Sequence, residues 1–339
     1  MTVHIAQVGL GYWGPNIARN LAAVEGGELV ALCDMNTERL ERMGRQLPGT
    51  RLVGDIEAVL SDPSIDAVVL ATPVDTHFAL ARSVLEAGKH VMVEKPLATT
   101  SEDCQTLIDL ADDGDLRLMV GHVFLYNAAV QKVKEYIDSG DVGEIYYVYS
   151  QRLNLGQVRH DVNAMWNFAP HDISILCHWL DAEPLSVTAH GHAYIQPDIE
   201  DVVFMNLDFP RGIGANVHIS WLDPLKVRRM TVVGSEKMVV YDDVSADAKV
   251  VVYDRGVTKR LLDRADATLG AYRSYGEFQL LLRAGDVLIP KIDFTEPLQL
   301  ECQHFVDAIR NGTTPLTDGR QGLAVVRALE TAQRSLSAR

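Results

Sequence analysis

A glycine pattern near the start of the chain constrains the fold most strongly. The segment VGLGYWG has the GxGxxG spacing, with its glycines at Gly9, Gly11 and Gly14. The apolar segment 4–10 leads into it and predicts a buried strand, and 15–25, which opens with proline, predicts a helix. An acidic residue, Asp34, lies 20 positions beyond Gly14 at the end of the next apolar segment. This order of strand, glycine turn, helix and acidic residue predicts a dinucleotide-binding α/β domain.

Each glycine has a separate expected task. Gly9 allows the tight turn, Gly11 lets the backbone approach a pyrophosphate, and Gly14 permits close packing of helix on strand. The helix N-terminus then offers unpaired N–H groups to the anion. The aromatic residues of the same loop, Tyr12 and Trp13, are further candidates for cofactor contact.

Asp34 bears on the choice of cofactor. Its carboxylate is expected to accept hydrogen bonds from the adenosine ribose and to repel a 2′-phosphate, which favours NAD over NADP. Arg39 leaves an alternative open, because an arginine there suits either the adenine face or a phosphate. Asn36 is placed with them as a cofactor candidate, and a simple strand-end cap is the alternative for Asp34.

The first third of the chain alternates strand and helix. Strands are predicted over 4–10, 28–34, 51–53, 65–72, 90–95 and 117–123. Helices are predicted over 15–25, 37–46, 56–61 and 76–87, and from a capping box of Thr99 with Glu102 to residue 112. Apolar strands separated by helices indicate a parallel sheet covered on both faces.

After about residue 122 the pattern changes. A helix (128–139) and a strand (144–152) lead to strands without helices between them, over 186–194, 201–209, 214–221, 228–234, 238–242 and 249–253. Their two-residue alternation predicts an open, mainly antiparallel sheet with one face on a core, and two helices follow, the second over 319–335. The fold class is therefore α/β: a Rossmann dinucleotide-binding domain over 1–122 and an α+β substrate-binding and oligomerisation domain over 123–339. The two final helices are candidates for packing back on the first domain.

Bulk properties exclude several classes of partner. A chain of 339 residues is too long for one small core, and a formal net charge of −15 argues against binding nucleic acid or an anionic membrane. There is no signal-peptide pattern and no apolar stretch of membrane length.

The four cysteines, Cys33, Cys104, Cys177 and Cys302, have no metal-ligand or redox spacing, which favours a reducing cytoplasm. No metal site is expected: His122, His190, His192 and His218 are interpreted as strand-surface histidines.

The segment VEKPLATT (93–100) places Lys95 between a glutamate and a proline. Pro96 has no N–H and cannot continue a central strand, so the strand ends there. Lys95 then lies at the carboxyl edge of a parallel sheet, where doubly wound folds bind ligands. A surface charge and a phosphate clamp are the alternatives to a catalytic group, and the clamp is disfavoured because the glycine loop already serves the pyrophosphate.

Four motifs carry a family resemblance: the glycine loop, Ala71-Thr72-Pro73 with His77, Glu94-Lys95-Pro96 and Glu296-Pro297-Leu298. In their order and spacing the chain resembles the glucose–fructose oxidoreductase / inositol dehydrogenase / MocA family over essentially its whole length. The resemblance implies cofactor contacts from Thr72, Pro73, His77, Glu94 and Lys95. It implies that Lys95 is catalytic, contacting the nicotinamide ribose and the reacting hydroxyl and stabilising an alkoxide or relaying its proton. It also implies that the second domain's sheet covers the active site and forms homodimers or homotetramers.

The segment MWNFAPHDISILCHWL (165–180) is similar to the other active-site stretch of that family. The resemblance makes His171 the second catalytic residue, with Asn167 at a position usually held by aspartate. Pro170 is predicted to occupy the first position of a helix, and a helix N-terminus would keep His171 neutral and able to accept a hydroxyl proton. Asparagine can orient a sugar hydroxyl but cannot act as a base. Asp172 is a candidate substitute, with helix-end electrostatics as its alternative role.

The segments RLNLG (152–156) and WLDPLKVRRMTVVG (221–234) resemble sugar-nucleotide 3-dehydrogenases and sugar 3-ketoreductases of the family. Substrate contacts are therefore expected from Lys95, Arg152, Asn154, Trp166, Asn167 and His171. Candidates for a nucleotide diphosphate are Arg152, Arg159, Lys226, Arg228 and Arg229, each with a solvated strand-edge charge as the alternative. Trp166 and Tyr126 suit either a sugar or packing between the domains.

The expected function is a cytoplasmic NAD-dependent oxidoreductase. Hydride would pass between nicotinamide and a secondary hydroxyl or ketone of a sugar or sugar nucleotide, such as the 3-position of a UDP-sugar, while Lys95 and His171 handle the proton. Two alternatives remain open: a redox-assisted lyase, isomerase or glycoside-cleaving enzyme that retains its NAD, and a non-catalytic NAD-bound sensor.

Overall fold

The chain forms two compact units in a computed structural model that describes residues 2–156, 158–257 and 282–337. The first unit comprises Met1–Asn127, Ile173–Ile175 and Phe294–Thr331. The second comprises Ala128–Asp172, Leu176–Asp293 and Ala332–Arg339.

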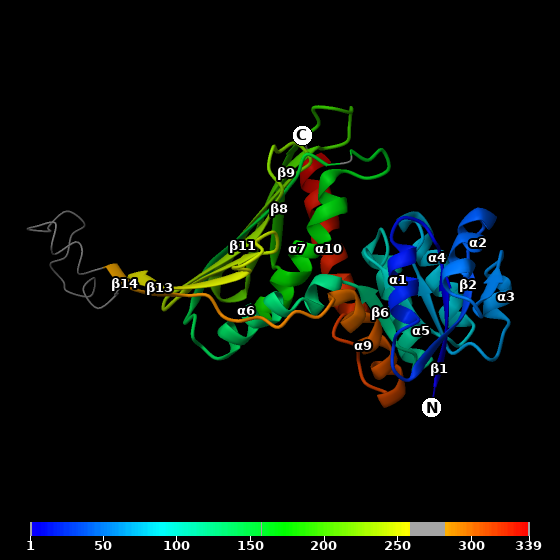
Figure 1. The fold of residues 1–339 in the computed structure, drawn as a ribbon. Helices are drawn as coiled ribbons and strands as arrows, with labels where there is room; N and C mark the ends of the chain where they lie inside the picture. Colours follow the sequence, from blue (N-terminus) through cyan, green and yellow to red (C-terminus); the bar gives the residue numbers. More distant parts are fainter. Residues whose placement is uncertain (1, 157, 258–281, 338–339) are drawn as a thin grey trace, which may run out of the picture. The chain divides into compact units, whose positions relative to one another are not determined.

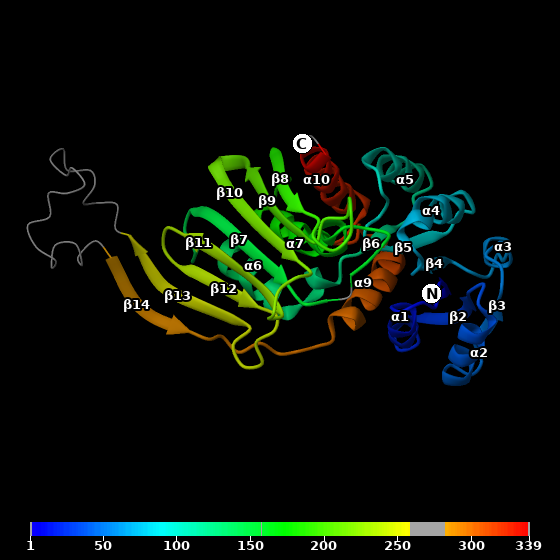
Figure 2. The same ribbon diagram turned by 90° about the horizontal axis from the view of Figure 1, so that it is seen from above.

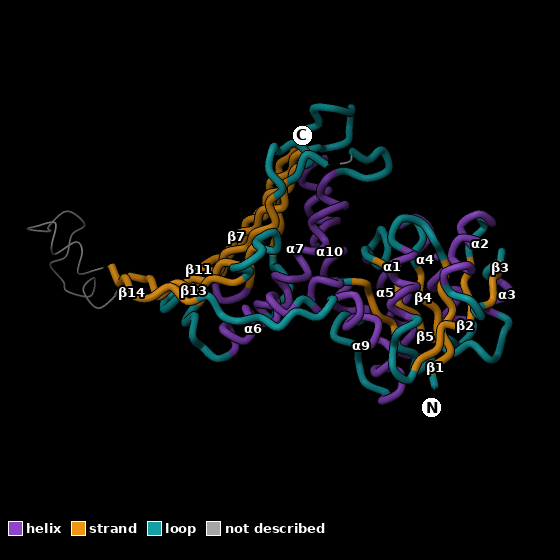
Figure 3. The backbone as a smooth tube through the Cα atoms, in the orientation of Figure 1, coloured by secondary structure: helices purple, strands orange, loops and turns teal. Residues whose placement is uncertain are grey.

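The first unit is built on a six-stranded, all-parallel sheet of order β3-β2-β1-β4-β5-β6 (Figures 1 and 3). Its strands are β1 (Val3–Val8), β2 (Gly27–Cys33), β3 (Arg51–Val53), β4 (Ala67–Leu70), β5 (His90–Glu94) and β6 (Leu118–Gly121). This is the strand order of a Rossmann domain, and it reverses direction between β1 and β4. The prediction of a parallel dinucleotide-type sheet is confirmed.

Helices of the first unit follow the strands in alternation. They are α1 (Gly14–Leu21), α2 (Thr37–Gln46), α3 (Glu57–Leu60), η1 (Val74–Thr76), α4 (His77–Glu86), α5 (Ser101–Asp113) and η2 (Val123–Tyr126). The predicted cap of α5 is wrong by one residue: Thr100, not Thr99, is the N-cap, and its hydroxyl accepts the N–H of Asp103. Two adjacent threonines offered the same local chemistry, and Thr100 has the extended backbone of a cap.

The C-terminal helix α9 (Pro297–Asn311) contributes to the core of the first unit. Its buried face joins that of α1 in one cluster whose members include Ile17, Ala18, Leu21, Leu298, Cys302, Phe305 and Val306. The Arg19 guanidinium donates two hydrogen bonds to the Glu296 carboxylate at the start of this helix. The last helix, α10 (Gly319–Ser337), begins in the first unit and ends in the second.

The second unit contains an eight-stranded sheet of order β14-β13-β12-β11-β7-β10-β9-β8 (Figure 2). Its strands are β7 (Ile145–Leu153), β8 (Ser186–His192), β9 (Val202–Phe209), β10 (Ile213–Ser220), β11 (Val227–Gly234), β12 (Met238–Asp242), β13 (Val250–Val257) and β14 (Leu282–Leu288), and η3 (Pro210–Gly212) joins β9 to β10. All pairs are antiparallel except β7 with β10. The mainly antiparallel sheet is confirmed, and β14 is a strand that the sequence did not indicate.

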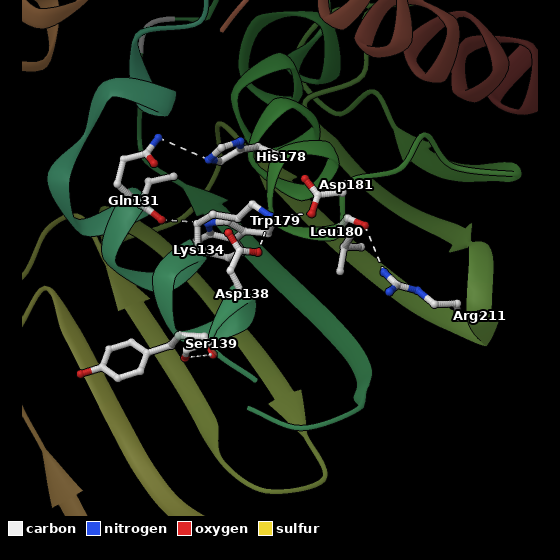
Figure 4. Close-up of polar contacts among 11 residues, drawn as sticks. Gln131, Lys134, Asp138, Ser139, His178, Trp179, Leu180, Asp181 and Arg211 are labelled. Atoms are coloured by element: carbon white, nitrogen blue, oxygen red, sulfur yellow. Dashed lines mark hydrogen bonds and ion pairs between the residues drawn. The ribbon is translucent and has the colours of Figure 1, made fainter. Parts of the chain in front are cut away.

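Helices α6 (Ala128–Asp138) and α7 (Ala164–Leu180) lie along one face of this sheet (Figures 1 and 2). Polar contacts fasten α6 to the end of α7 (Figure 4). The Trp179 indole N–H donates to the Val130 carbonyl at 3.0 Å, and the Lys134 ammonium contacts both Asp138 and Asp181. These contacts hold the C-terminal end of α7 in place.

The opposite face of the sheet bears no helix within the described ranges (Figures 1 and 2). Large side chains are exposed on its strands, including Tyr147 at 47% and Phe204 at 39% exposure. Association into homodimers or homotetramers through this sheet stays a prediction. Across the described part of the chain, no helix combines the length and apolar character needed to span a membrane.

Candidate active site

The glycine loop between β1 and α1 is tightly constrained. Gly9 has φ +95°, a conformation that favours glycine, and a Cβ there would lie 2.4 Å from the carbonyl oxygen of Ala71. A Cβ on Gly14 would lie 2.4 Å from the carbonyl oxygen of Gly9, whereas a Cβ on Gly11 would meet nothing within 4 Å. Two of the three glycines are therefore required by the close approach of other backbone atoms, and Gly11 leaves open space at the surface of the loop.

Gln7 holds the two ends of this loop together, a role that the sequence pattern did not reveal. Its side chain is fully buried, and Nε2 donates to the carbonyl oxygens of Gly9 at 3.0 Å and Gly14 at 2.8 Å. A buried glutamine in the middle of an otherwise apolar strand was the available signal. Its amide orders the turn from within the domain, so it is a structural partner of the loop.

The two glycines at positions 14 and 11 make a matched pair for mutation. Gly14→Ala is expected to lower the free energy of unfolding by about 1–3 kcal/mol, because the added methyl overpacks the turn. Gly11→Ala is expected to leave stability unchanged and to weaken NAD binding about tenfold, since its methyl projects where the pyrophosphate would approach. Urea unfolding and titration with NAD separate the two effects. Equal loss of stability in both variants would contradict this assignment.

Asp34 organises the loop from the end of β2. Its carboxylate accepts the N–H of Leu10 at 2.7 Å and the N–H of Asn36 at 2.8 Å. Asn36 is in turn the N-cap of α2 and accepts the N–H of Arg39 at 3.0 Å, while the Arg39 guanidinium lies 3.9 Å from Asp34. The three predicted cofactor residues of this segment are thus one hydrogen-bonded group beside the glycine loop.

The aromatic residues at the tip of the loop differ in exposure. Tyr12 is almost fully exposed, and Trp13 is 38% exposed. The Trp13 side chain acts on Glu94 and lowers the pKa of that carboxyl, which relates the glycine loop to the end of β5. Both are accessible to a ligand, and their contact with the cofactor stays a prediction.

His77 joins the loops that follow β4 and β5. It is buried, with Nδ1 2.8 Å from the Pro96 carbonyl oxygen and Nε2 3.0 Å from the Thr72 carbonyl oxygen. Burial lowers the pKa of His77, while the two carbonyls act in the opposite direction. One ring nitrogen donates in the neutral form, so the imidazole acts as a brace that fixes the Thr72-Pro73 turn beside Lys95.

Lys95 follows the last residue of β5 at the carboxyl edge of the sheet, as predicted from Pro96. The N–H of Lys95 donates to the Glu94 carboxylate at 3.2 Å. Burial raises the pKa of Glu94 to about 7, although the Lys95 ammonium, the N–H of Lys95 and the Trp13 side chain lower it. A lysine and a carboxyl that titrates near neutrality therefore meet at the edge where doubly wound folds bind ligands.

His122, at the end of β6, is buried and not on a strand surface, which corrects the sequence interpretation. Burial and the nearby Lys95 ammonium lower the pKa of His122 to about 3, so it is neutral at physiological pH. The other histidines considered lie on the second sheet, where His190 contacts His192 and His218 stacks on Phe204 at 4.3 Å. Among the described residues no group of His, Cys, Asp or Glu is arranged to hold a metal ion.

In the second unit, α7 carries three of the predicted substrate residues, Trp166, Asn167 and His171, and corrects the position of His171. The helix begins at Ala164, with Asn163 as its N-cap, so Pro170 lies inside it and His171 is not in the first turn. His171 therefore lies away from the helix N-terminus, and the prediction that this N-terminus keeps it neutral is wrong. Asn163 was a signal in the sequence for the true start of this helix, because asparagine is a common N-cap residue.

Asn167 and Trp166 lie in the first turn of α7, where Asn163 accepts the N–H of Trp166. The Trp166 indole donates to Gln333 at 3.1 Å. Asn154 lies just after β7, and its N–H donates to the Ser220 carbonyl at 3.1 Å. The two catalytic candidates belong to different compact units, Lys95 to the first and His171 to the second.

Arg152 and Asp172 form a buried ion pair between β7 and α7. The Arg152 Nε lies 2.6 Å from the Asp172 carboxylate, and the Ser150 hydroxyl donates to the same carboxylate at 2.6 Å. Side-chain exposure is 5% for Arg152 and 2% for Asp172. The Asp172 carboxylate therefore already accepts hydrogen bonds from two donors. Asp172 also lies in the interior of α7, so it does not have the role at a helix end that was its alternative. Contact of Arg152 with substrate stays a prediction.

The other arginines proposed for a diphosphate also contact carboxylates. Arg159 pairs with Asp161, and Arg229 pairs with Asp242 at 2.7 Å. The guanidinium of Arg228 lies 3.2 Å from Asp243. Lys226 is exposed. A diphosphate bound by these arginines would have to compete with the carboxylates.

Tyr126 packs inside the first unit. It is buried, and its hydroxyl lies 3.2 Å from that of Thr317. Its ring lies 5.4 Å from that of His304 on α9. These contacts anchor η2 to the C-terminal segment of the unit.

Two family profiles match the chain in succession. Residues 3–122 match the profile described as an oxidoreductase family with an NAD-binding Rossmann fold. Residues 130–240 match the GFO/IDH/MocA C-terminal domain. The first unit is thus an NAD-binding Rossmann domain, and the matched ranges together cover more than half of the chain.

Individual proteins are similar over most of the chain. The scyllo-inositol 2-dehydrogenase (NAD(+)) of Bacillus subtilis is 27% identical over 326 residues, covering 93% of this chain and 88% of that protein. The UDP-N-acetylglucosamine 3-dehydrogenase of Acidithiobacillus ferrooxidans is 28% identical over 250 residues, covering 74% of this chain and 76% of that protein. A solved structure of the latter enzyme has a TM-score of 0.82 at 24% identity and covers 100% of this chain and 98% of that one.

Proposed function

Because this chain belongs to the GFO/IDH/MocA family of oxidoreductases, we propose that it transfers hydride between NAD and a secondary alcohol of a cyclitol or sugar. The related scyllo-inositol 2-dehydrogenase and UDP-N-acetylglucosamine 3-dehydrogenase support this class of substrate. The nicotinamide ring would supply the hydride acceptor. The residues of the chain would bind the cofactor, orient the hydroxyl and move its proton.

One observation carries the proposal: Lys95 stands at the carboxyl edge of the parallel sheet beside Glu94 and the glycine loop. His77 fixes the adjoining turn through Thr72 and Pro96, so the backbone that presents the lysine is braced. In this role the Lys95 ammonium would stabilise the developing alkoxide or exchange its proton with the hydroxyl. His171 is the second proposed proton carrier.

The charge arrangement favours an uncharged polyol over a nucleotide sugar. Of the arginines considered for a diphosphate, Arg152 is buried against Asp172, and the others already contact aspartates. Releasing a guanidinium from such a carboxylate costs part of what a phosphate contact would contribute. We therefore place cyclitols and free sugars first among substrates.

A substrate panel tests this order. The purified protein with NAD is expected to produce NADH, measured by its absorbance, on at least one cyclitol or free sugar at a higher kcat/KM than on any UDP-sugar. A sugar nucleotide as the best substrate would move the function to the second candidate, which the UDP-N-acetylglucosamine 3-dehydrogenase relative favours. NAD that copurifies and is reduced without release of NADH would instead indicate a reaction in which the cofactor is recycled. Binding of NAD with no reduction on any compound would contradict the proposal.

A further inference from the structure

Helix α9 places a carboxyl group, Glu301, inside the first unit. Its side chain is 0% exposed, and neither carboxyl oxygen has a hydrogen-bond partner among the described residues. The residues beside it in the helix face the same core, including Leu298, Cys302 and Phe305. An ionised carboxylate without donors in such a place is strongly disfavoured, because burial removes its hydration.

Glu94 is the carboxyl that acts on Glu301. Burial is the main cause that raises the pKa of Glu301 well above its ordinary value, and the charge of Glu94 raises it further. Glu94 itself lies against β6, since a Cβ added at Gly121 would be 3.1 Å from its Cδ and Oε1. It accepts the N–H of Lys95, and Trp13 also favours its charged form, whereas Glu301 accepts no hydrogen bond among the described residues. The donors therefore favour a negative charge on Glu94 and not on Glu301.

Lys95 is the cation that acts on Glu94. Three titratable groups interact with the pair directly: Lys95 at the end of β5, Tyr126 on η2 and Cys302 on α9. Around these, His77 and His122 interact with Lys95, and Arg19 and Glu296 interact with Cys302. Both His77 and His122 have a lowered pKa. The Lys95 ammonium acts on Glu94, whereas the groups that act on Glu301 include no cation, so a charge on Glu301 would have neither a donor nor a cation to balance it among the described residues.

We propose that Glu94 and Glu301 act as one buried carboxyl pair behind Lys95, in which Glu301 keeps its proton and Glu94 alone ionises. This rests on the proposed role of Lys95. The protonated Glu301 leaves a single negative charge beside the lysine. That charge holds the ammonium in place and falls away when Glu94 takes up a proton.

The pH dependence of stability tests the state of Glu301. In the unfolded chain Glu301 ionises near its ordinary pKa of 4.5, whereas the folded protein keeps the proton. Unfolding therefore releases this proton above pH 4.5. As a result, the equilibrium constant for folding of the wild type falls by up to tenfold for each pH unit above 4.5. Glu301→Gln cannot ionise, so its stability relative to the wild type is expected to increase by that factor per pH unit from about pH 5 upward. Urea unfolding followed by circular dichroism measures the difference.

Two further variants keep this test decisive. Glu301→Met also cannot ionise and introduces no buried amide, so it is expected to show the same pH slope even where Glu301→Gln folds poorly. Asp307→Asn makes the same acid-to-amide change on a partly exposed side chain of the same helix. A constant difference between wild type and both Glu301 variants at all pH values would overturn the proposal. A slope shared equally by Asp307→Asn would trace to net charge and overturn it as well.

The activity profile tests the link to Lys95. With the substrate found by the panel, kcat/KM of the wild type is expected to fall on the acid side with a midpoint near 7, the pKa of Glu94. Glu301→Gln keeps that midpoint, and Glu94→Gln abolishes it. A midpoint displaced by a full pH unit in Glu301→Gln would mean that the carboxyls share the proton, which overturns the assignment. The stability readout needs no substrate, so failure of the proposed function would be recognised separately.

Discussion

Replacing Lys95 with alanine is expected to lower turnover by about three orders of magnitude while NAD still binds. The lysine is the group at the carboxyl edge of the sheet that can both carry a positive charge and give up a proton beside Glu94. Its loss removes the stabilisation of the alkoxide at the moment when the hydride moves. NADH production under saturating substrate measures turnover, and a titration followed by tryptophan fluorescence measures NAD binding.

Lys95→Arg separates charge from proton transfer. Arginine retains a positive charge but does not release its proton at physiological pH, so turnover is expected to stay low while substrate binding recovers. Lys132→Ala, which removes a partly exposed lysine on α6, is the control for loss of one positive charge. Turnover within tenfold of the wild type in Lys95→Ala would contradict the catalytic assignment. Loss of NAD binding in the same variant would instead indicate a role in holding the cofactor.

The glycine loop and the parallel sheet could be predicted because their signals are local. The spacing of Gly9, Gly11 and Gly14, with Asp34 beyond them, specifies a turn, a helix N-terminus and a strand end within 30 residues. Pro96 likewise stops β5 by its own chemistry, which is why Lys95 was placed correctly at the sheet edge. The structure adds the reason for two of the glycines, which is close approach of other backbone atoms.

Features that depend on distant residues were not predictable in the same way. Pro170 suggested a helix start, but tertiary packing extends α7 six residues towards the N-terminus, to Ala164. Arg152 and Asp172 are 20 residues apart, and only the pairing of β7 with α7 makes them partners. Glu301 had a partial signal, since it falls on the apolar face of α9, but its relation to Glu94 requires the fold.

Removing Arg152 is expected to destabilise the second unit by about 3–5 kcal/mol. The alanine variant would leave the Asp172 carboxylate buried with the Ser150 hydroxyl as its remaining donor from the ion-pair group. Unfolding by urea, followed through tryptophan fluorescence, reports on this unit because Trp179 and Trp221 are buried in it. The pair fastens α7 to β7 next to His171, so stability and the placement of that histidine are lost together.

Two variants decide between a structural pair and a substrate contact at Arg152. Arg229→Ala breaks the exposed pair with Asp242 on the neighbouring strand and is expected to cost less than about 1 kcal/mol. The double variant Arg152→Met/Asp172→Leu is expected to be more stable than Arg152→Ala, because no unpaired charge remains in the interior. If Arg152→Ala instead unfolds like the wild type but raises KM at least tenfold, the guanidinium acts on substrate, and its pairing with Asp172 must be exchanged when substrate binds.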